Sequence, residues 1–326
     1  MDSNIDKPAP RVSVIMPSYN TAALIGASLD SVFQQTFQDF EVIVVNDGSP
    51  DTAELETVLG PYLKRIVYIK QENKRAAGAR NTAIRQSRGE FLAFLDSDDV
   101  WFPTHLAAQM RLFERDPELG LVYSNCFLSG DASQMERFMD SCPSDGPANF
   151  VSLIAGRCQI PVSTVVARKT ALVKAGLFDE GMLRCDDYDM WLRTAFCGAK
   201  IGYTREVQAR LNQGRPGSLG VTNVKMIEAC SQILEKTRRT LPLSDTDREI
   251  VHNRANEIHG MHLLELAKVR LHQGQFQDAR KLFAEANSHL HRRKLDLVLL
   301  GLGTAPRLTR ELFVIASRMR GVSAVS

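Results

Sequence analysis

The chain has 326 residues, of which 44% are hydrophobic and 24% are charged, as is typical of a soluble globular protein of about two domains. The formal net charge of +2 excludes a protein whose overall charge attracts nucleic acid. The six cysteines stand singly, without the Cys/His spacing of a zinc site or the pairing of a disulfide framework. We therefore expect free thiols in a reducing compartment.

The N-terminal residues 1–10 are polar and are expected to form a disordered lead. No apolar stretch follows that could form the core of a signal peptide, and no apolar run is long enough to span a bilayer. The sequence therefore predicts a cytoplasmic protein.

Four nearly continuous apolar runs in the first hundred residues predict strands that are covered on both faces. Helical patterns separate these runs, and the alternation of strand and helix is typical of a mostly parallel sheet flanked by helices. The expected strands are residues 12–16, 41–45, 66–69 and 91–95, and the expected helices are residues 21–35, 52–63 and 76–87.

The middle of the chain is mixed in pattern. Residues 121–128 and 162–168 are predicted as strands, and residues 169–175 and 188–196 as helices. The stretch 129–149 is rich in Ser, Asp, Pro and Gly, which predicts a long loop that faces the substrate or forms a lid.

From residue 221 onward the pattern indicates helices only, so we expect one domain over 11–220 and a helical region over 221–326. Two antiparallel helices are predicted to meet at Gly274. Their pattern is similar to one tetratricopeptide-like unit, and a single unit cannot bury its own apolar face. A helical hairpin packed on the rest of the chain is the favoured interpretation.

Polar clusters follow the predicted strands at the edge where parallel α/β sheets bind ligands. In an extended backbone, Asp96 and Asp98 point to the same side. Paired carboxylates favour Mg²⁺ or Mn²⁺, with water and a diphosphate as the remaining ligands. The alternative is a polar turn that caps the next helix. The clusters are Pro17-Ser18-Tyr19-Asn20, Asn46-Asp47-Gly48-Ser49, Gln71-Glu72-Asn73 and Asp96-Ser97-Asp98-Asp99.

The first two clusters can contact a nucleobase. Asp47 can accept a hydrogen bond from a ring N–H, or it belongs to a simple Asp-Gly turn. Tyr19 can stack on a base or pack against the sheet edge. No GxGxxG motif follows the first strand, which argues against a dinucleotide-binding domain.

In their order and spacing, these motifs resemble glycosyltransferase family 2 over residues 10–220. The resemblance implies a GT-A fold, a nucleotide-sugar donor and inversion at the anomeric carbon. It is carried by Val14-Ile15-Met16-Pro17-Ser18-Tyr19-Asn20, Val45-Asn46-Asp47-Gly48-Ser49-Pro50-Asp51, Ala79-Arg80-Asn81, Phe94-Leu95-Asp96-Ser97-Asp98-Asp99, Gly176-Leu177-Phe178-Asp179-Glu180, Asp186-Asp187-Tyr188-Asp189-Met190-Trp191-Leu192 and Arg215-Pro216-Gly217-Ser218.

The resemblance also implies roles for single residues. Asp187 matches the general base, with Asp186 in place of the glutamate that usually precedes it, and Arg75 stands where relatives usually carry glycine. Asp96 and Asp98 match the DxD metal-binding element, with Asp98 as the more direct ligand. The implied donor-binding residues are Pro17, Tyr19, Asn20, Asp47, Arg80, Asp96, Ser97, Asp98 and Arg215.

On this basis the chain is expected to transfer a sugar, with UDP-sugar as the expected donor, to a hydroxyl of a glycan or lipid-linked acceptor in polysaccharide or glycoconjugate biosynthesis. Helix capping remains an alternative role for Asp186 and Asp187. The alternative functions are a non-catalytic interaction protein and a sugar-1-phosphate nucleotidyltransferase, which would need a Gly-rich loop after the first strand. A metal site at His259, His262 and Glu265 is less favoured than a solvated helix face.

The C-terminal segment 291–326 is basic, with seven basic and two acidic residues and a net charge of +5. Its basic residues alternate with apolar runs. The segment is therefore predicted either to contact an anionic membrane surface, on the inner face of the membrane, or to dock as helices on the enzyme body.

Overall fold

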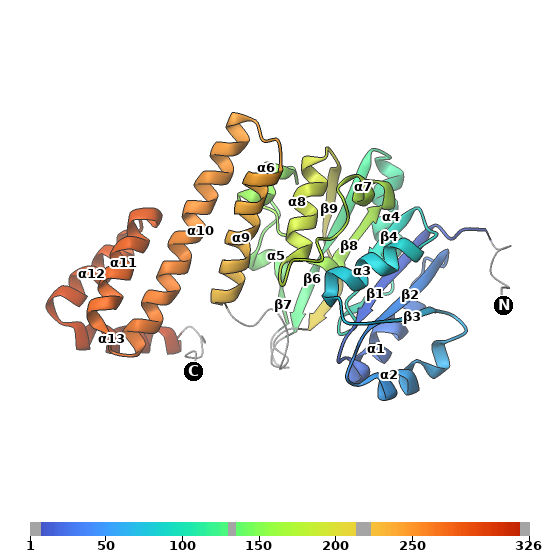
Figure 1. Cartoon of the computed structure of the whole chain (residues 1–326), viewed down its shortest axis with the longest axis horizontal. Coiled ribbons are helices and arrows are strands. Elements are labelled where there is room, and N and C mark those ends of the chain that lie inside the picture. The colour runs from blue at the N-terminus through green and yellow to red at the C-terminus, as the bar shows by residue number, and fades with distance from the viewer. Residues whose placement is uncertain (1–7, 130–134, 213–222, 320–326) are drawn as a thin grey trace. The chain divides into compact units, whose positions relative to one another are not determined.

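The computed structural model describes residues 8–129, 135–212 and 223–319 (Figure 1). The chain divides into two compact units, residues 1–218 and 219–326, each of which is described by itself. The division lies two residues from the domain boundary expected from the sequence. Most of the predicted N-terminal lead, residues 1–7, lies outside the described residues.

The first unit is built on a mixed sheet. Within the described ranges, nine strands pair in the order β3-β2-β1-β4-β8-β6-β9-β5, and β7 pairs with β6. Strands β1 to β4 are parallel to one another, β8 is antiparallel to β4 and β6, and β6 and β9 are parallel. The bounds are β1 Val12–Ser18, β2 Phe40–Asp47, β3 Val67–Gln71, β4 Phe91–Phe94, β5 Val100–Trp101, β6 Leu119–Ser129, β7 Met135–Arg137, β8 Val165–Arg168 and β9 Lys200–Asn212.

Helices cover both faces of this sheet, and α3 and α8 lie on the face toward the viewer in Figure 1. The right-handed crossovers place α1 and α2 on the opposite face from α3, because the strand order reverses after β3. The helices of this unit are α1 Ala22–Phe33, α2 Thr52–Leu59, α3 Arg75–Gln86, α4 His105–Arg115, α5 Phe138–Ser141, α6 Phe150–Ile154, α7 Lys169–Lys174 and α8 Asp186–Phe196, with 3₁₀ turns at Gly60–Tyr62 and Val162–Thr164.

The alternation of side chains along buried strands supplies two hydrophobic layers. Val12, Val14 and Met16 of β1 pack in one core with apolar residues of α1, α2 and α4. On the other face, Phe94 of β4 contacts Trp191 of α8 edge to face, with ring centroids 5.9 Å apart. The sheet is therefore held rigidly between helices, which fixes the positions of the loops at its carboxyl edge.

Three sequence-based expectations about this unit are wrong. The strand at 67–71 is half-exposed rather than covered on both faces, because β3 is the edge strand. The predicted loop 129–149 contains β7 and α5, although residues 130–134 lie outside the described residues. Residues 162–164 form a 3₁₀ turn before β8, and the long strand β9 was not predicted at all.

The second unit is helical over its described residues, as predicted. Helices α10 and α11 pack against each other and meet at Gly274, whose φ of +74° suits glycine. Their shared core includes Leu271, Phe283 and Leu302. The helices are α9 Asn223–Thr240, α10 Asp245–His272, α11 Phe276–Leu290, α12 Arg293–Thr304 and α13 Pro306–Met319.

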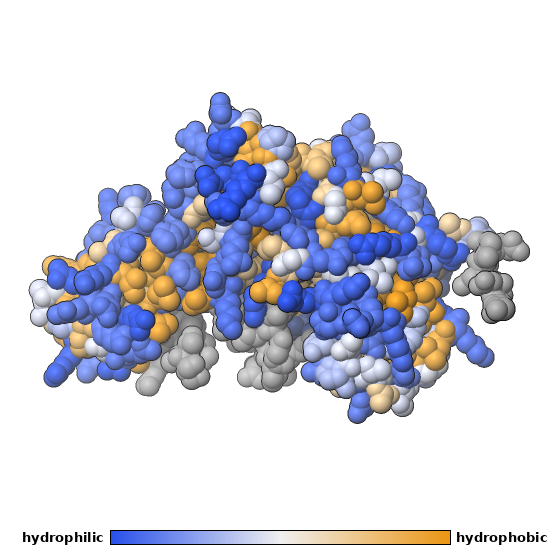
Figure 2. Space-filling view, in the orientation of Figure 1, coloured by the Kyte–Doolittle hydropathy of each residue, from blue (hydrophilic) through white to orange (hydrophobic). Residues whose placement is uncertain are grey.

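The surface of both units mixes hydrophilic and apolar residues on the face shown in Figure 2. Among the described residues, no helix combines the length and apolar character needed to cross a bilayer. The structure pairs none of the six cysteines, all of which lie within the described residues, in a disulfide.

Candidate active site

The site lies at the carboxyl edge of the sheet, where β1, β2, β3 and β4 end side by side. Each strand is followed by one of the polar clusters noted in the sequence. The parallel pairing therefore brings Asp47, which ends β2, and Asp96, which follows β4, to the same edge, with β1 between their strands.

The turn after β4 presents two side chains outward and buries two. Asp96 and Asp98 are partly exposed, whereas Ser97 and Asp99 are only 3% and 6% exposed. The backbone N–H of Asp99 closes the turn by donating to the Asp96 carbonyl at 3.0 Å. Asp96 and Asp98 are thus the more exposed residues of the cluster, although the backbone here forms a turn rather than the extended strand from which their common side was expected.

Arg80 of α3 links this turn to the first turn of α8. Its buried guanidinium donates from Nη2 to Asp96 Oδ1 at 2.7 Å and from Nη1 to Asp186 Oδ2 at 2.6 Å. Burial alone lowers the pKa of Arg80, but the charges of Asp96 and Asp186 outweigh burial, and the pKa is raised. A charged group at this depth is strongly destabilising without its partners, so these contacts fix the two acidic segments relative to each other.

Asp187, the next residue of α8, has a different environment from Asp186. Burial raises the pKa of Asp187 to about 6, and the negative charge of Asp186 adds to this effect. Arg80 opposes it, as does the backbone N–H of Tyr188, which donates to Asp187 Oδ1 at 2.8 Å. A carboxylate with a pKa near 6 is ionised at neutral pH and is a stronger base than an ordinary aspartate.

Asp186 and Asp187 therefore have different environments. Asp186 is the partner of Arg80, and Asp187 keeps a raised pKa. Both lie in the first turn of the helix, where negative charge also stabilises the helix end. The alternative of side-chain capping is not seen, because the N-cap is Cys185 and its side chain makes no capping hydrogen bond at this helix end.

Asp47 organises the loop that follows β3. Its side chain is 2% exposed, and its Oδ1 accepts hydrogen bonds from Gln71 Nε2 at 2.6 Å and from the Lys74 N–H at 2.8 Å. Gly48 has a φ of +65°, and a Cβ atom there would lie 2.8 Å from the backbone nitrogen of Asn73. The Asp-Gly pair is thus required by the close approach of two loops.

The loop after β1 leaves an aromatic ring at the surface. Tyr19 is 50% exposed, which disfavours the alternative that it packs against the sheet edge. Asn20 adopts a φ of +54°, and its backbone N–H donates to Ser49 Oγ at 2.6 Å. Pro17 lies within β1, one residue before its end. The loops after β1 and β2 are therefore tied together next to the Tyr19 ring.

Ser97 differs from expectation. Its hydroxyl is buried and hydrogen-bonds with Thr21 Oγ1 at 2.8 Å, and Thr21 in turn bonds with Ser18 Oγ at 2.9 Å. The side chain of Ser97 is therefore used inside the fold, where it holds the turn after β4 against the start of α1.

Ser163 and Asn212 also support the turn after β4, and neither was identified from the sequence. Ser163, just before β8, donates from Oγ to Asp99 Oδ2 at 2.5 Å and accepts from the Asp96 N–H at 3.1 Å. Asp99 Oδ1 also accepts from the Asn212 N–H at 2.8 Å, at the end of β9. Burial, followed by the charges of Asp96 and Asp98, raises the pKa of Asp99. No local pattern marks Ser163, because its partners are distant in the chain.

Asn81 connects two of the sequence motifs. Its amide donates to the Phe178 carbonyl at 2.8 Å and to Glu180 Oε1 at 2.9 Å, and its Oδ1 accepts from the Phe178 N–H at 3.0 Å.

Arg75 has a φ of +62°, the left-handed region in which glycine is unstrained. This conformation accounts for the glycine expected at that position.

The expected metal ligands make a partial ligand set. The carboxylates of Asp96 and Asp98 fit a hard divalent cation whose other ligands are a diphosphate and water. Two neighbouring carboxylates repel each other, and a cation or the guanidinium of Arg80 offsets this repulsion. Among the described residues, no group of three or more His, Cys, Asp or Glu side chains could hold a metal on its own. This applies to His259, His262 and Glu265, where the Glu265 carboxylate pairs with Lys268 at 2.5 Å. Arg215 lies outside the described residues.

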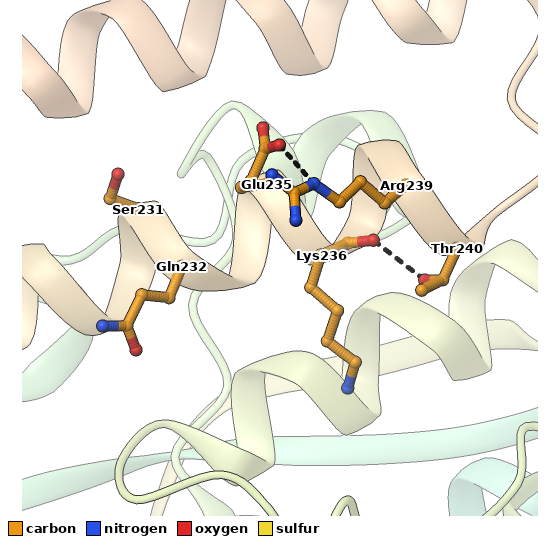
Figure 3. Close-up of a pocket in the computed structure, with 6 residues that line it drawn as sticks. All are labelled: Ser231, Gln232, Glu235, Lys236, Arg239 and Thr240. Atoms are coloured by element: carbon orange, nitrogen blue, oxygen red, sulfur yellow. Dashed lines mark hydrogen bonds and ion pairs between the residues drawn. The ribbon is translucent and has the colours of Figure 1, made fainter.

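Two surface hollows are lined by residues other than these carboxylates. One is lined by α9 alone, and Figure 3 shows two of its charged side chains joined: Arg239 Nε donates to Glu235 Oε1 at 2.6 Å. The other is lined by residues of β6, β7 and β9 and includes the edge-to-face pair Phe102 and Phe127. Neither contains a pair of carboxylates.

A mixed sheet with this strand order, flanked by helices and bearing an acidic turn after its fourth strand, defines a GT-A fold. Solved structures agree with this assignment. The mannosyltransferase PcManGT from Pyrobaculum calidifontis, in complex with GDP-Man and Mn²⁺, is 21% identical with a TM-score of 0.63, over 97% of this chain and 88% of that one. S. aureus TarS 1–349 in complex with UDP is 16% identical with a TM-score of 0.59, over 95% and 92%.

Sequence comparison identifies the family. Residues 13–148 match the family model of glycosyl transferase family 2. The Escherichia coli protein WfgD, named UDP-Glc:alpha-D-GlcNAc-diphosphoundecaprenol beta-1,3-glucosyltransferase, is 35% identical over 56% of this chain and 68% of its own. WfaP, an E. coli protein with the same enzyme name, is 30% identical over 69% and 85%. The chain belongs to glycosyltransferase family 2 and is a glycosyltransferase.

Other relatives are longer. An uncharacterized glycosyltransferase of Rickettsia felis is 30% identical over 58% of this chain but only 32% of its own length, so the chain spans about a third of that relative. Membership of the family confirms the expected fold and enzyme class. It does not favour the nucleotidyltransferase alternative.

Proposed function

We propose that the protein is an inverting glycosyltransferase that moves a sugar from a UDP-sugar to a hydroxyl of a lipid-linked glycan acceptor, in polysaccharide or glycoconjugate biosynthesis. The observation that carries this proposal is the pair of contacts made by Arg80. One guanidinium holds both the turn of Asp96 and Asp98 and the helix end of Asp187 in one region. A leaving-group site and a base site are thus adjacent, as a single displacement requires.

The donor is proposed to bind along the carboxyl ends of β1, β2 and β4. The exposed ring of Tyr19 suits stacking on a base. Asp47 is proposed to accept a hydrogen bond from a ring N–H in addition to the two that its Oδ1 accepts within the fold. Pro17 and Asn20 flank this position in the sequence of the first loop. The assignment of UDP rests on the enzyme name of WfgD and WfaP, since nothing in the fold distinguishes uracil from guanine.

Asp98 and Asp96 are proposed to hold Mn²⁺ or Mg²⁺ together with the donor diphosphate. When bound, such a cation offsets the negative charge that develops on the departing nucleoside diphosphate. Arg80 already neutralises one oxygen of Asp96, which limits the repulsion between the two carboxylates before a cation arrives. The Mn²⁺ complex of PcManGT is consistent with this proposal. Arg215, expected near the diphosphate, is a further proposed contact.

Asp187 is proposed as the general base. Its carboxylate accepts the proton of the acceptor hydroxyl while the oxygen attacks the anomeric carbon, and the bond from that carbon to the diphosphate breaks on the opposite face. The electron pair of the broken bond leaves with the nucleoside diphosphate. A pKa near 6 keeps Asp187 ionised at neutral pH and strengthens it as a base. General-base catalysis of this kind contributes about 10²–10⁴-fold.

The acceptor is proposed to be a glycan on a lipid diphosphate, because the enzyme names of WfgD and WfaP specify GlcNAc-diphosphoundecaprenol. An acceptor of this kind lies in a membrane. We therefore propose that the protein works on the inner, cytoplasmic face of that membrane.

The test is a transfer reaction with a panel of nucleotide sugars, Mn²⁺ and a synthetic GlcNAc-diphospho-lipid. We expect one UDP-sugar to be consumed and a product whose new bond has the opposite anomeric configuration, as read by NMR coupling constants. Chelation of the metal should stop transfer. A product that retains the donor configuration would refute the single displacement, and donor binding with no transfer to any lipid-linked acceptor would refute the acceptor class.

A further inference from the structure

The C-terminal helices α12 and α13 carry an unusual share of exposed apolar residues. Of the eleven large apolar side chains that the described residues expose, five lie between residues 297 and 315. We call these five side chains the hairpin surface. They are Leu297 at 70% exposed, Leu300 at 66%, Leu308 at 55%, Leu312 at 59% and Ile315 at 53%.

The exposed leucines of α12 do not belong to the face of that helix that packs in the core. Leu295 and Leu302 of α12 are buried at 7% and 5% exposure, in the core that α10 and α11 also build. Helix α12 therefore already uses one apolar face for folding, while Leu297 and Leu300 lie on another. Packing within the helical unit therefore occupies only the first face and leaves Leu297 and Leu300 exposed.

The exposed residues follow helical spacing. Leu308, Leu312 and Ile315 are four and three residues apart, so they form one stripe along α13. The two helices cross closely, since a Cβ atom at Gly301 would lie 2.6 Å from Thr309 Oγ1. Each helix, with 12 and 14 residues, is too short to span a bilayer, which needs about 20.

The charge beside these stripes is positive. Arg292, Arg293 and Lys294 are exposed at the start of α12, and Arg307 and Arg310 are exposed on α13. Segment 291–326 has a net charge of +5, whereas the rest of the chain has −3. Pairing two copies of this surface would bring like charges together. An anionic lipid surface matches both the charge and the apolar stripes.

We propose that the hairpin surface docks the protein on an anionic membrane, with the leucines inserted at the headgroup boundary and the basic residues on the lipid phosphates. This inference rests on the proposed function only in one respect: the lipid-linked acceptor explains why the protein would bind a membrane. Membrane binding itself can be measured without donor, acceptor or catalysis, so the two proposals fail independently.

The experiment uses full-length variants, because truncation before α12 would remove Leu295 and Leu302 from the core. Arg307→Glu/Leu308→Gln changes one adjacent exposed pair on the hairpin. Its matched control is Leu63→Gln/Lys64→Glu, an adjacent exposed pair on the other unit with the same loss of one leucine and reversal of one charge. All three proteins are floated with vesicles of equal parts phosphatidylglycerol and phosphatidylcholine, and with phosphatidylcholine alone.

Wild type and the control should float with the anionic vesicles, and binding of the hairpin variant should be weaker by about tenfold or more. Binding should also fall as salt rises, since exposed charges are screened. Equal flotation of the hairpin variant and the control would overturn the proposal. So would a wild type that never floats but forms a dimer that Arg307→Glu/Leu308→Gln dissociates, which would assign the surface to a second copy of the chain.

Discussion

Replacing Asp187 by asparagine should make the protein more stable at alkaline pH while removing its proposed base. Burial raises the folded-state pKa of this carboxyl from 3.8 to about 6. A raised folded-state pKa means that the stabilisation from the neutral acid is complete below about pH 4 and is lost as pH rises through 6. Above that pH, the folded protein holds an ionised carboxylate that burial disfavours, and asparagine removes this cost.

The size of the effect follows from the same values. At 1.36 kcal/mol per pH unit, the interval between 3.8 and about 6 sets a ceiling of about 3 kcal/mol. Urea unfolding of wild type and Asp187→Asn at pH 4 and pH 8 measures it. We expect the stability difference between the two proteins to shift in favour of the variant by about 1–3 kcal/mol between these pH values. A difference that stays constant with pH, or shifts toward wild type, would refute the reasoning.

Three other substitutions test the architecture of the site. Arg80→Met should lower the free energy of unfolding in urea by about 3–5 kcal/mol, because it leaves two carboxylates unpaired. Adding Asp186→Asn should restore part of this loss. A double variant no more stable than the single one would argue against the ion pair. Gly48→Ala should lower the free energy of unfolding by more than about 1 kcal/mol, because its φ is +65° and a backbone nitrogen lies 2.8 Å from the new Cβ. Gly60→Ala, with no atom within 4 Å, is the control and should be close to neutral. Ser163→Ala should cost about 1–3 kcal/mol by removing a donor to a buried carboxylate, and should weaken Mn²⁺-dependent donor binding; unchanged donor affinity would limit Ser163 to a structural role.

The strands that build the site could be predicted because their signals are local. Buried parallel strands are continuous apolar runs, and the polar residues that follow them are equally visible in the sequence. Parallel pairing then brings Asp47 and Asp96 to one edge without further information. The outward placement of Asp96 and Asp98 depends on the turn that follows β4, so the alternation of an extended backbone does not by itself explain it.

The contacts that join these segments could not be predicted. Arg80 and Asp186 are 106 residues apart, and Ser163 and Asp99 are 64 apart, so no local pattern pairs them. The resemblance to the family singled out Asp187 as the base, but the pairing of Asp186 with Arg80 could not be predicted for the same reason. The burial of Ser97 could not be predicted either, because the sequence does not say which side of a turn faces solvent.

The missed strands have a physical explanation as well. Strand β9 carries polar and charged residues through most of its length, and register shifts interrupt its pairing with β6. Strand β7 is three residues long and exposed. Both are stabilised by their neighbours in the sheet rather than by their own hydrophobicity.

The central claim is that carboxylates from two distant segments serve one reaction, one on the leaving group and the other on the acceptor. Donor affinity and single-turnover transfer, measured with Mn²⁺ for Asp98→Ala and Asp187→Asn, test it most directly. We expect Asp98→Ala to lose metal-dependent donor binding, and Asp187→Asn to bind donor as wild type does while transfer falls by about 10²–10⁴-fold. Transfer by Asp187→Asn at the wild-type rate would contradict the account.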